Sequence, residues 1–208
     1  MGTYVYEVMA NVGEAITRNK QMLTDLDAAI GDGDHGINMA RGFEAVHSKM
    51  QAMEAEIDIG KVMKTVGMTL ISSVGGAAGP LYGTAFLRAA GPSQQKTQVD
   101  VETAGLMLGA AITGIKERGK AIRGEKTMLD ALEPAYDAFM EGAKDGKSLI
   151  ACLEVACEAA QQGVEYTKTI VATKGRASYL GERSRGHQDP GATSSYIMLK
   201  ALLEFLRR

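Results

Sequence analysis

Four aspartates fall within ten residues, and their types and spacing could do chemistry. Asp25, Asp27, Asp32 and Asp34 belong to the run LTDLDAAIGDGDHG at positions 23–36. Clustered carboxylates repel one another, so water or a cation must screen them. A ligand set rich in oxygen and poor in nitrogen favours a hard cation such as Mg²⁺ or Ca²⁺. A solvated acidic loop is the alternative, but the run lies between apolar helical patterns, which favours a metal site.

Two familiar motifs are poor matches for this run. An EF-hand loop needs a bidentate Glu at its twelfth position, and Phe43 stands there if Asp32 is the first. Gly31 to Gly36 satisfies G-x-G-x-x-G, but a dinucleotide fingerprint follows a strand, and the upstream pattern here is helical. Two of the intervening residues are also aspartates, so phosphate could approach only through a cation. The run therefore predicts Mg²⁺ on the carboxylates and a nucleotide on the Mg²⁺.

A second segment, SSVGGAAGPLYGT at 72–84, places small residues ahead of a helix. Its backbone amides could cradle phosphate at a helix N-terminus. It is not a Walker A loop, because no Lys-Ser or Lys-Thr pair follows a glycine at the required spacing. Small residues could equally allow two helices to cross closely. The sequence leaves both interpretations open.

A third segment, residues 174–193, joins cations, glycines and a helix start. Guanidinium groups and free amides can stabilise the charge of a transferring phosphoryl group. A solvated basic loop is the alternative, because lysine and arginine are usually exposed. The segment is long for a loop without secondary structure, which favours function. The lone His47, on a polar helical face, is expected to be solvated.

Helical periodicity must position these three segments, and it predicts an all-α fold with one domain over residues 1–208. Four residues are expected to cap helices: Asp58, Asp100, Ser148 and Asp189. A bend is expected at Pro134, and the carboxylate run is expected to be a loop. About eight helices are predicted, at 3–20, 37–53, 59–71, 81–90, 100–118, 127–140, 148–169 and from 190 onward.

Composition excludes several classes of function. A net charge of −2 gives no broad basic field for nucleic acid. No apolar run is long enough to cross a bilayer, and the N-terminus lacks a signal-peptide pattern, so we expect a cytoplasmic protein without a membrane role. Cys152 and Cys157 match neither a redox nor a zinc spacing and are expected to be buried free thiols.

Four motifs together resemble the L subunits of dihydroxyacetone kinases that work through the phosphotransferase system. The motifs are LDAAIGDGDHG, SSVGGAAGPLYGT, GEKTMLD and KGRASYLGERSRGHQDPGA, in the family's order and spacing over nearly the whole chain. The resemblance implies an antiparallel barrel of eight helices with ADP or ATP and paired Mg²⁺ ions at one end. It implies three metal ligands: Asp27, Asp32 and Asp34.

The resemblance also implies a set of nucleotide-binding residues. The phosphates would meet the helix start at His35, Gly36, Ile37 and Asn38 and the amides of Ala77 and Ala78. Family members often have serine in place of Ala78, so only the amide contact is expected there. Gly119 and Met128 would border the adenine. Arg176 would close the site with Asp189, Pro190 and Gly191; it is also the catalytic candidate, with Arg183 and Arg185 as alternatives.

The reaction implied by the resemblance needs partners. The bound nucleotide would pass its γ-phosphoryl group to dihydroxyacetone on a separate K subunit, and a phosphocarrier M subunit would recharge the ADP. Related triose or tetrose kinases share these motifs. Two further functions stay open: the nucleotide domain of a fatty-acid kinase, and an ADP-sensing module for a transcriptional regulator. Activity with purified K and M partners would separate these functions.

Overall fold

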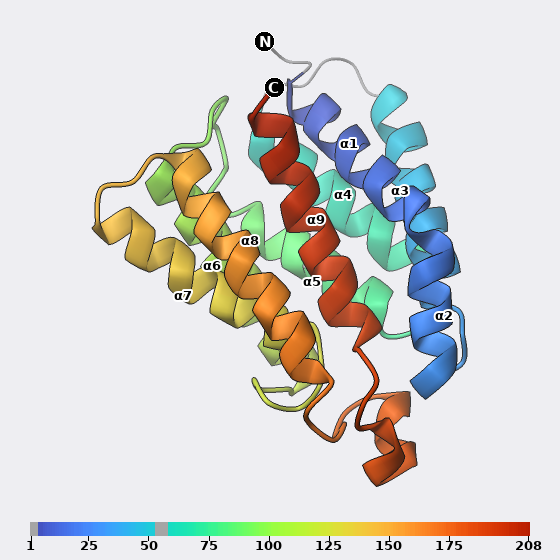
Figure 1. Cartoon of the computed structure of the whole chain (residues 1–208). Helices are drawn as coiled ribbons and strands as arrows, with labels where there is room; N and C mark the ends of the chain where they lie inside the picture. The colour runs from blue at the N-terminus through green and yellow to red at the C-terminus, as the bar shows by residue number, and fades with distance from the viewer. Residues whose placement is uncertain (1–3, 53–57) are drawn as a thin grey trace.

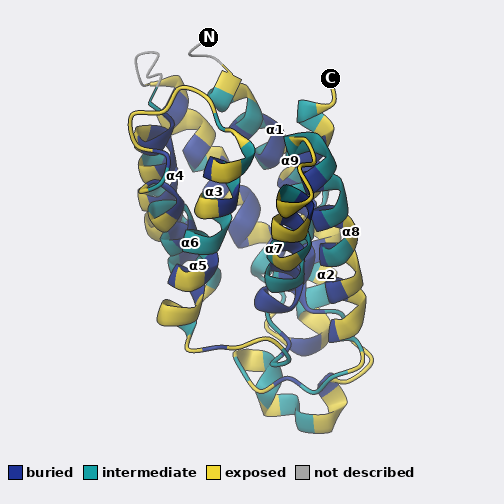
Figure 2. Ribbon diagram, turned by 90° about the vertical axis from the view of Figure 1, so that its left-hand side faces the viewer, coloured by how far each residue is buried: buried dark blue, intermediate teal, exposed yellow. Residues whose placement is uncertain are grey.

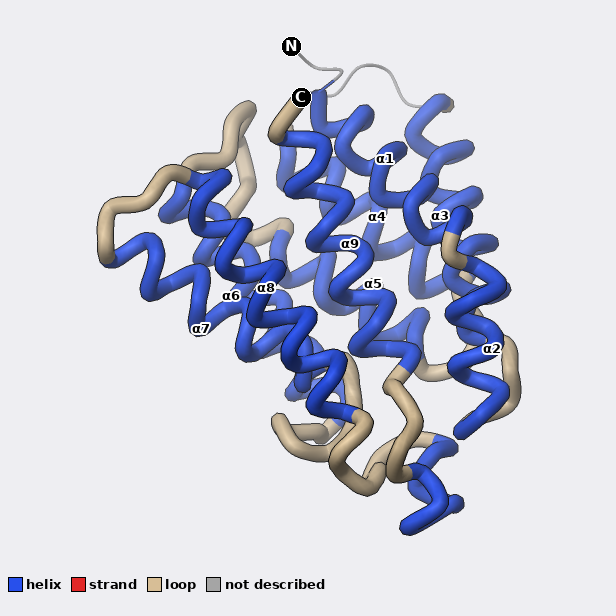
Figure 3. Tube along the Cα trace, in the orientation of Figure 1, coloured by secondary structure: helices blue, strands red, loops and turns tan. Residues whose placement is uncertain are grey.

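The computed structural model describes residues 4–52 and 58–208, and every regular element within them is helical (Figure 3). The all-α prediction is therefore confirmed. The elements are α1 (Tyr4–Arg18), α2 (Lys20–Ile30), α3 (His35–Gln51), α4 (Ile59–Ser73), α5 (Ala78–Ala89), α6 (Val101–Gly119), α7 (Leu129–Lys144), α8 (Leu149–Thr167), the 3-10 helix η1 (Arg176–Ser184) and α9 (Pro190–Leu206).

The four predicted N-caps are confirmed. Asp58, Asp100, Ser148 and Asp189 each accept a hydrogen bond from a backbone amide two or three residues later. Such a bond satisfies one of the first-turn amides that have no partner within the helix. At α9 the cap is followed directly by Pro190, whose missing N–H is not needed at the first helical position.

The helices pack side by side, with their buried faces turned toward one another (Figures 1 and 2). One apolar cluster joins α1, α3, α4, α5 and α6, with Ile16, Val66 and Leu70 fully buried. A second joins α7, α8 and α9 around Phe139 and Leu153. Apolar burial at roughly 25 cal/mol per Å² is the main favourable term that holds such a bundle together.

The two ends of the bundle differ. The start of α1 and the C-terminus lie at one end, and η1 lies at the other, beside α2 (Figure 1). The connection between α6 and α7 meets the segment before η1 there, because the Thr173 amide donates to the Glu125 carbonyl. None of the helices in residues 4–52 and 58–208 combines the length and apolarity that a membrane span needs.

Helix α2 corrects the prediction that the carboxylate run is a loop from its start. Leu23 and Ile30 are buried, whereas Asp25 is exposed, so water screens that carboxylate without disturbing the helix. With α2 and η1, the described residues form more helices than the eight that the sequence predicts. The expected helix start at Thr3 and helix end at Met53 lie outside the described residues.

Several other boundaries differ from the sequence prediction. α3 begins at His35, and α5 begins at Ala78 rather than Leu81. Pro80 fits in the first turn of α5 because the first helical amides have no intrahelical acceptor. α7 continues through Pro134 to Lys144. The two cysteines are buried free thiols, as predicted.

Candidate functional site

The three predicted metal ligands meet at the η1 end of the molecule. Asp27 lies in the last turn of α2, and Asp32 and Asp34 lie in the connection to α3. One carboxylate oxygen from each lies within 4.8 Å of the others, the only such group of three acidic, cysteine or histidine side chains among the described residues. The three residues are close in the sequence, and the end of α2 brings their oxygens into one cluster.

Backbone contacts fix the orientation of Asp27. Its Oδ2 accepts hydrogen bonds from the amides of Asp34, at 2.9 Å, and His35, at 3.1 Å. A Cβ on Gly31 would lie 2.2 Å from Asp27 Oδ1, so only glycine leaves room for the carboxylate there. Gly33 has φ of +70°, a conformation that glycine adopts without steric cost. The glycines of this run therefore shape the connection around the carboxylates.

The donor set fits a hard divalent cation. The three ligands offer only carboxylate oxygens, Asp32 is exposed, and Asp34 is half-buried, so an ion could reach them from solvent. Asp27 Oδ2 accepts hydrogen bonds from two backbone amides. Hydrogen bonds from groups that do not touch the metal commonly orient metal-binding carboxylates in this way.

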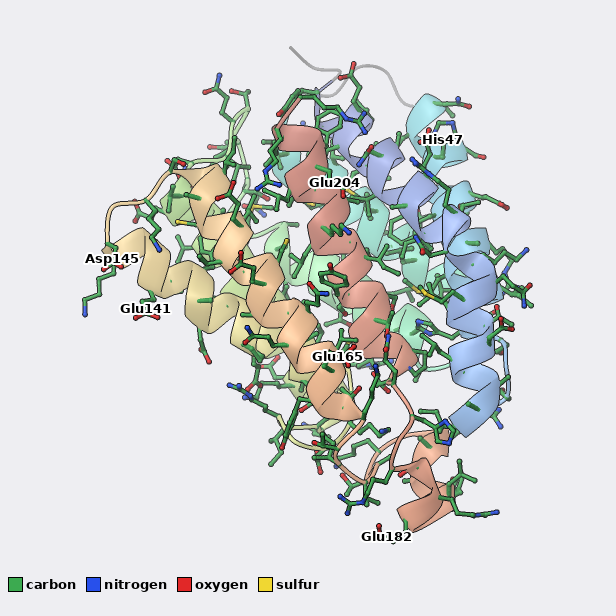
Figure 4. The ribbon with its side chains drawn as sticks, viewed as in Figure 1. His47, Glu141, Asp145, Glu165, Glu182 and Glu204 are labelled. Carbon is green, nitrogen blue, oxygen red and sulfur yellow. The ribbon has the colours of Figure 1, made fainter. Side chains whose placement is uncertain are left out.

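Arg176 is the arginine that reaches this cluster. It begins η1, and its guanidinium lies 2.9 Å from Asp32 Oδ2. Arg185, by contrast, pairs with Glu182 at 3.1 Å and donates to the Thr169 carbonyl. Glu182 lies on η1 at the tip of this end of the molecule (Figure 4). Of these two candidates for contact with a phosphoryl group, only Arg176 touches a carboxylate of the cluster.

The predicted phosphate-facing segment 35–38 forms the first turn of α3, and two of its amides are already occupied. The His35 amide donates to Asp27, and the Asn38 amide donates to the Asp34 carbonyl. Helix geometry leaves the amides of Gly36 and Ile37 without an intrahelical acceptor. A Cβ on Gly36 would lie 2.0 Å from the Lys20 carbonyl, so glycine permits the close approach of α2 and α3.

The side chains of this turn have separate partners. Asn38 is buried, and its Oδ1 accepts from Arg41 at 2.7 Å. His35 Nε2 lies 2.9 Å from Ser194 Oγ on α9. Burial lowers the pKa of His35, against the opposing effect of the nearby Asp27 and Asp34 carboxylates. A neutral imidazole at physiological pH follows. His47 is exposed near the far end of the same helix, as predicted (Figure 4).

The small-residue segment serves a close helix crossing. A Cβ on Gly67 of α4 would lie 2.7 Å from the Gly83 carbonyl of α5, and a Cβ on Gly83 would meet Ile71 at 2.3 Å. The packing interpretation is therefore confirmed. The phosphate interpretation stays a prediction that concerns the first residues of α5: Ala77 precedes the helix, and Ala78 begins it after Gly76, which has φ of +65°.

The remaining predicted residues border the same end. A Cβ on Gly191 would lie 3.6 Å from the Met128 amide, which places the start of α9 against the start of α7. Gly119 ends α6 beside Leu81 of α5. Asp189 is buried as the N-cap of α9 and accepts from the Ala192 amide at 2.7 Å. One carboxylate oxygen of Asp189 is thus committed to its own helix.

A buried charge cluster beneath α9 was not predicted from the sequence. Lys126 is 2% exposed, and its ammonium donates to the carbonyls of Thr167 and His187. Asp130 is fully buried and accepts the amides of Gly124 and Thr127. Both charged residues belong to the GEKTMLD motif at 124–130, and that motif is the feature of the sequence that could have drawn attention to them.

This cluster contains one cation for two buried carboxylates. Burial raises the pKa of Asp189 to about 7, and the Asp130 and Asp27 carboxylates act in the same direction. The Lys126 ammonium and the Ala192 amide oppose that rise. Burial also lowers the pKa of Lys126, which the two carboxylates partly offset. The arrangement ties the α6–α7 connection to the end of α8 and the entry to α9.

Comparison with known proteins shows the family of this chain. The chain belongs to the DAK2 domain family, whose model matches residues 29–204. It is 44% identical over 200 residues to the PEP-dependent dihydroxyacetone kinase, ADP-binding subunit DhaL, of Escherichia coli (strain K12), covering 96% of this chain and 95% of that protein. The PEP-dependent dihydroxyacetone kinase 1, ADP-binding subunit DhaL, of Listeria innocua serovar 6a is 46% identical over 92% of this chain and 90% of its own length.

The fold also matches a solved kinase. The dihydroxyacetone kinase of C. freundii in complex with AMP-PNP and Mg²⁺ superposes with a TM-score of 0.73 and 28% identity. The match covers 96% of this chain and 33% of that one. A triokinase/FMN cyclase of Mus musculus is 32% identical over 90% of this chain but only 32% of its own length. This chain is therefore more similar to the two DhaL subunits than to the triokinase.

Proposed function

We propose that this chain is the nucleotide-binding L subunit of a dihydroxyacetone kinase. The observation that carries the proposal is the meeting of Asp27, Asp32 and Asp34 beside Arg176 at the end of a DAK2-family helical bundle. Mg²⁺ and ADP or ATP would bind there. The relatives matched along nearly their whole length are named as ADP-binding subunits, which favours this function over that of an autonomous triose kinase.

Each group at the site has a distinct proposed role. Asp27, Asp32 and Asp34 would hold Mg²⁺, which would offset the repulsion among their charges, and a bound pair of ions would neutralise phosphate charge. The amides at the starts of α3, α5 and α9 would donate to phosphate oxygens. Arg176, already at the edge of the cluster, would stabilise charge on the transferring phosphoryl group.

The acceptor would come on a partner. The γ-phosphoryl group leaves the bridging oxygen of ATP and forms a bond to a hydroxyl oxygen of dihydroxyacetone held by a K subunit. That hydroxyl releases its proton, and ADP stays on this chain. A phosphorylated M-type carrier then returns a phosphoryl group to that ADP. Phosphoryl transfer depends on alignment of donor and acceptor, so a chain that positions only the nucleotide gains little from proximity without its partner.

A coupled assay tests the proposal. With ATP and dihydroxyacetone alone, the purified chain should give negligible product, and addition of a K subunit should restore turnover. With catalytic ADP, sustained product should also require a phosphorylated M-type carrier. Native mass spectrometry should find ADP and Mg²⁺ retained on the purified chain. Rapid ATP-driven turnover by the isolated chain would overturn the subunit assignment.

A further inference from the structure

One buried hydroxyl group contacts the start of α9 from within α5. Tyr82 lies one turn after Ala78, and only 2% of its surface is exposed. Its hydroxyl donates to the Gly191 carbonyl at 2.9 Å and lies 2.7 Å from Ser194 Oγ and 2.8 Å from Ser195 Oγ. The phenol therefore fixes the start of α5 against the start of α9.

The same network continues to α3. Ser194 Oγ lies 2.9 Å from His35 Nε2, and the His35 amide donates to the Asp27 carboxylate. Ser195 has no such link in the described residues: besides Tyr82, its hydroxyl contacts the Gly191 carbonyl within its own helix. The path from Tyr82 to the carboxylate cluster thus runs through Ser194.

The three helix starts joined in this way each have first-turn amides without an acceptor in their own helix. Helix geometry leaves Gly36 and Ile37 of α3, Ala78 and Gly79 of α5 and Gly191 of α9 without intrahelical acceptors. A polyphosphate bound by several helix starts at once requires that their spacing be held to within a fraction of an ångström. A chain of hydrogen bonds between buried side chains can hold it.

We propose that Tyr82, acting through Ser194 and His35, is a positioning residue that holds the starts of α3, α5 and α9 at the spacing a nucleoside polyphosphate needs. The inference rests on the proposed function. It assigns Tyr82 no contact with the ligand, and it predicts that loss of the hydroxyl weakens recognition of the phosphates more than recognition of the nucleoside.

The Tyr82→Phe variant removes the hydroxyl and keeps the ring. Calorimetry in Mg²⁺ should show the affinity for ADP falling roughly tenfold, the size expected for lost hydrogen bonds between buried groups, and the affinity for AMP falling less than about twofold. The Tyr166→Phe variant, at an exposed position on α8, should leave both affinities unchanged. A buried tyrosine with a purely structural role would lower the melting temperature without changing the ratio of the two affinities.

Two neighbouring serines provide a matched pair. Ser194→Ala should reproduce the selective loss of ADP affinity, because it breaks the link to His35, whereas Ser195→Ala should cause less than half that loss on a logarithmic scale. Equal losses in the two serine variants would overturn the path through Ser194. If Tyr82→Phe does not fold, Ser194→Ala carries the same test.

The wild-type chain separates the two proposals. If it does not bind ADP in Mg²⁺ more tightly than AMP, the proposed function fails. If it does, but Tyr82→Phe and Ser194→Ala retain the wild-type ratio of ADP to AMP affinity, the positioning role is overturned and the proposed function stands.

Discussion

Two acidic clusters lie at the same end of the molecule and differ in how their charge is balanced. The inner cluster consists of Asp130, Asp189 and the ammonium of Lys126, all buried. The outer cluster consists of Asp27, Asp32 and Asp34, and within the described part of the chain its one ion pair to a side chain is the contact of Asp32 with the exposed Arg176. The inner cluster carries its own cation within the fold, whereas the outer cluster is open to a cation from solvent.

The difference follows from desolvation. A buried carboxylate that lacks a counter-charge costs several kcal/mol, so a stable fold must supply the cation or the proton itself. A carboxylate near the surface keeps its water and can exchange it for a metal ion. Residue type alone therefore does not distinguish a structural aspartate from a ligand; the source of its counter-charge does.

Removal of the inner cation should have the largest effect on stability. Lys126→Met preserves the approximate volume but leaves Asp130 and Asp189 without their ammonium and the Thr167 carbonyl without a donor. The free energy of unfolding should fall by about 3–5 kcal/mol, measured by urea denaturation. Lys168→Met is the control, because Lys168 makes an exposed ion pair with Glu165. Its effect should stay below about 1 kcal/mol.

If both lysine variants lose a similarly small amount of unfolding free energy, the inner cluster does not depend on the Lys126 ammonium, and the contrast with the outer cluster fails. Such a result would mean that the inner carboxylates are protonated or hydrated without help from Lys126. The unfolding curve at two values of pH would then distinguish these possibilities, since protonated carboxyl groups ionise as the pH rises.

The second prediction concerns the pH dependence that the inner cluster causes. The pKa of Asp189 is raised to about 7 when folded, whereas an unfolded aspartate titrates near 3.9. Between these values the folded state binds more protons, so the Asp189 contribution to stability is lost as the pH rises from about 4 to about 7. The loss should be on the order of 2–4 kcal/mol.

Asp189→Asn isolates this contribution. Asparagine remains a good N-cap for α9 but does not titrate. The difference in unfolding free energy, variant minus wild type, should grow in favour of the variant from pH 4 to pH 8, because the groups that face Asp189, namely Asp130, Lys126 and Asp27, are the same in both proteins. A constant difference over that range would show that Asp189 ionises at its ordinary pKa.

Local physics made much of the fold predictable. The caps at Asp58, Asp100, Ser148 and Asp189 join groups only two or three residues apart, so the sequence contains the whole interaction. Helix α2 differs from the sequence prediction because a run of carboxylates is typical of a loop, whereas Leu23 and Ile30 fall on one helical face. At that segment the burial of two apolar side chains outweighed the preference of aspartate for turns.

In the site, as in the fold, the sequence predicts groups that lie close together along the chain. The run of four aspartates at 25–34 predicts a metal site, the family resemblance selects Asp27, Asp32 and Asp34 as its ligands, and the structure brings oxygens of these three together. Lys126 and Tyr82 were not identified, because their partners Thr167 and Ser194 are 41 and 112 residues away. Only the packing of α5 against α9, and of the α6–α7 connection against the end of α8, brings those groups into contact, and no local pattern contains that information.

The third prediction addresses the outer cluster. Asp32→Asn removes one charge at an exposed position, so the unfolding free energy should change by less than about 1 kcal/mol. The affinity for ADP in Mg²⁺ should fall tenfold or more, because a neutral amide is a weaker ligand for a hard cation. Calorimetry measures the affinity, and Asp25→Asn, at an exposed position of α2 outside the cluster, is the control. Unchanged affinity in Asp32→Asn would remove that residue from the metal site.

The smallest change in stability is expected at Arg176. Its ion pair with Asp32 joins side chains that are 68% and 37% exposed, and such pairs contribute little because water and salt screen them. Arg176→Ala should therefore change the unfolding free energy by less than about 0.5 kcal/mol. Turnover with a K subunit should nevertheless fall at least tenfold, because the proposed role of the guanidinium is to stabilise charge in the transition state.

Arg185→Ala, which removes the pair with Glu182, is the matched control on the same segment. Wild-type turnover in Arg176→Ala together with a large loss in Arg185→Ala would transfer the catalytic role to the second arginine, and the contact between Arg176 and the outer cluster would then have no part in the chemistry.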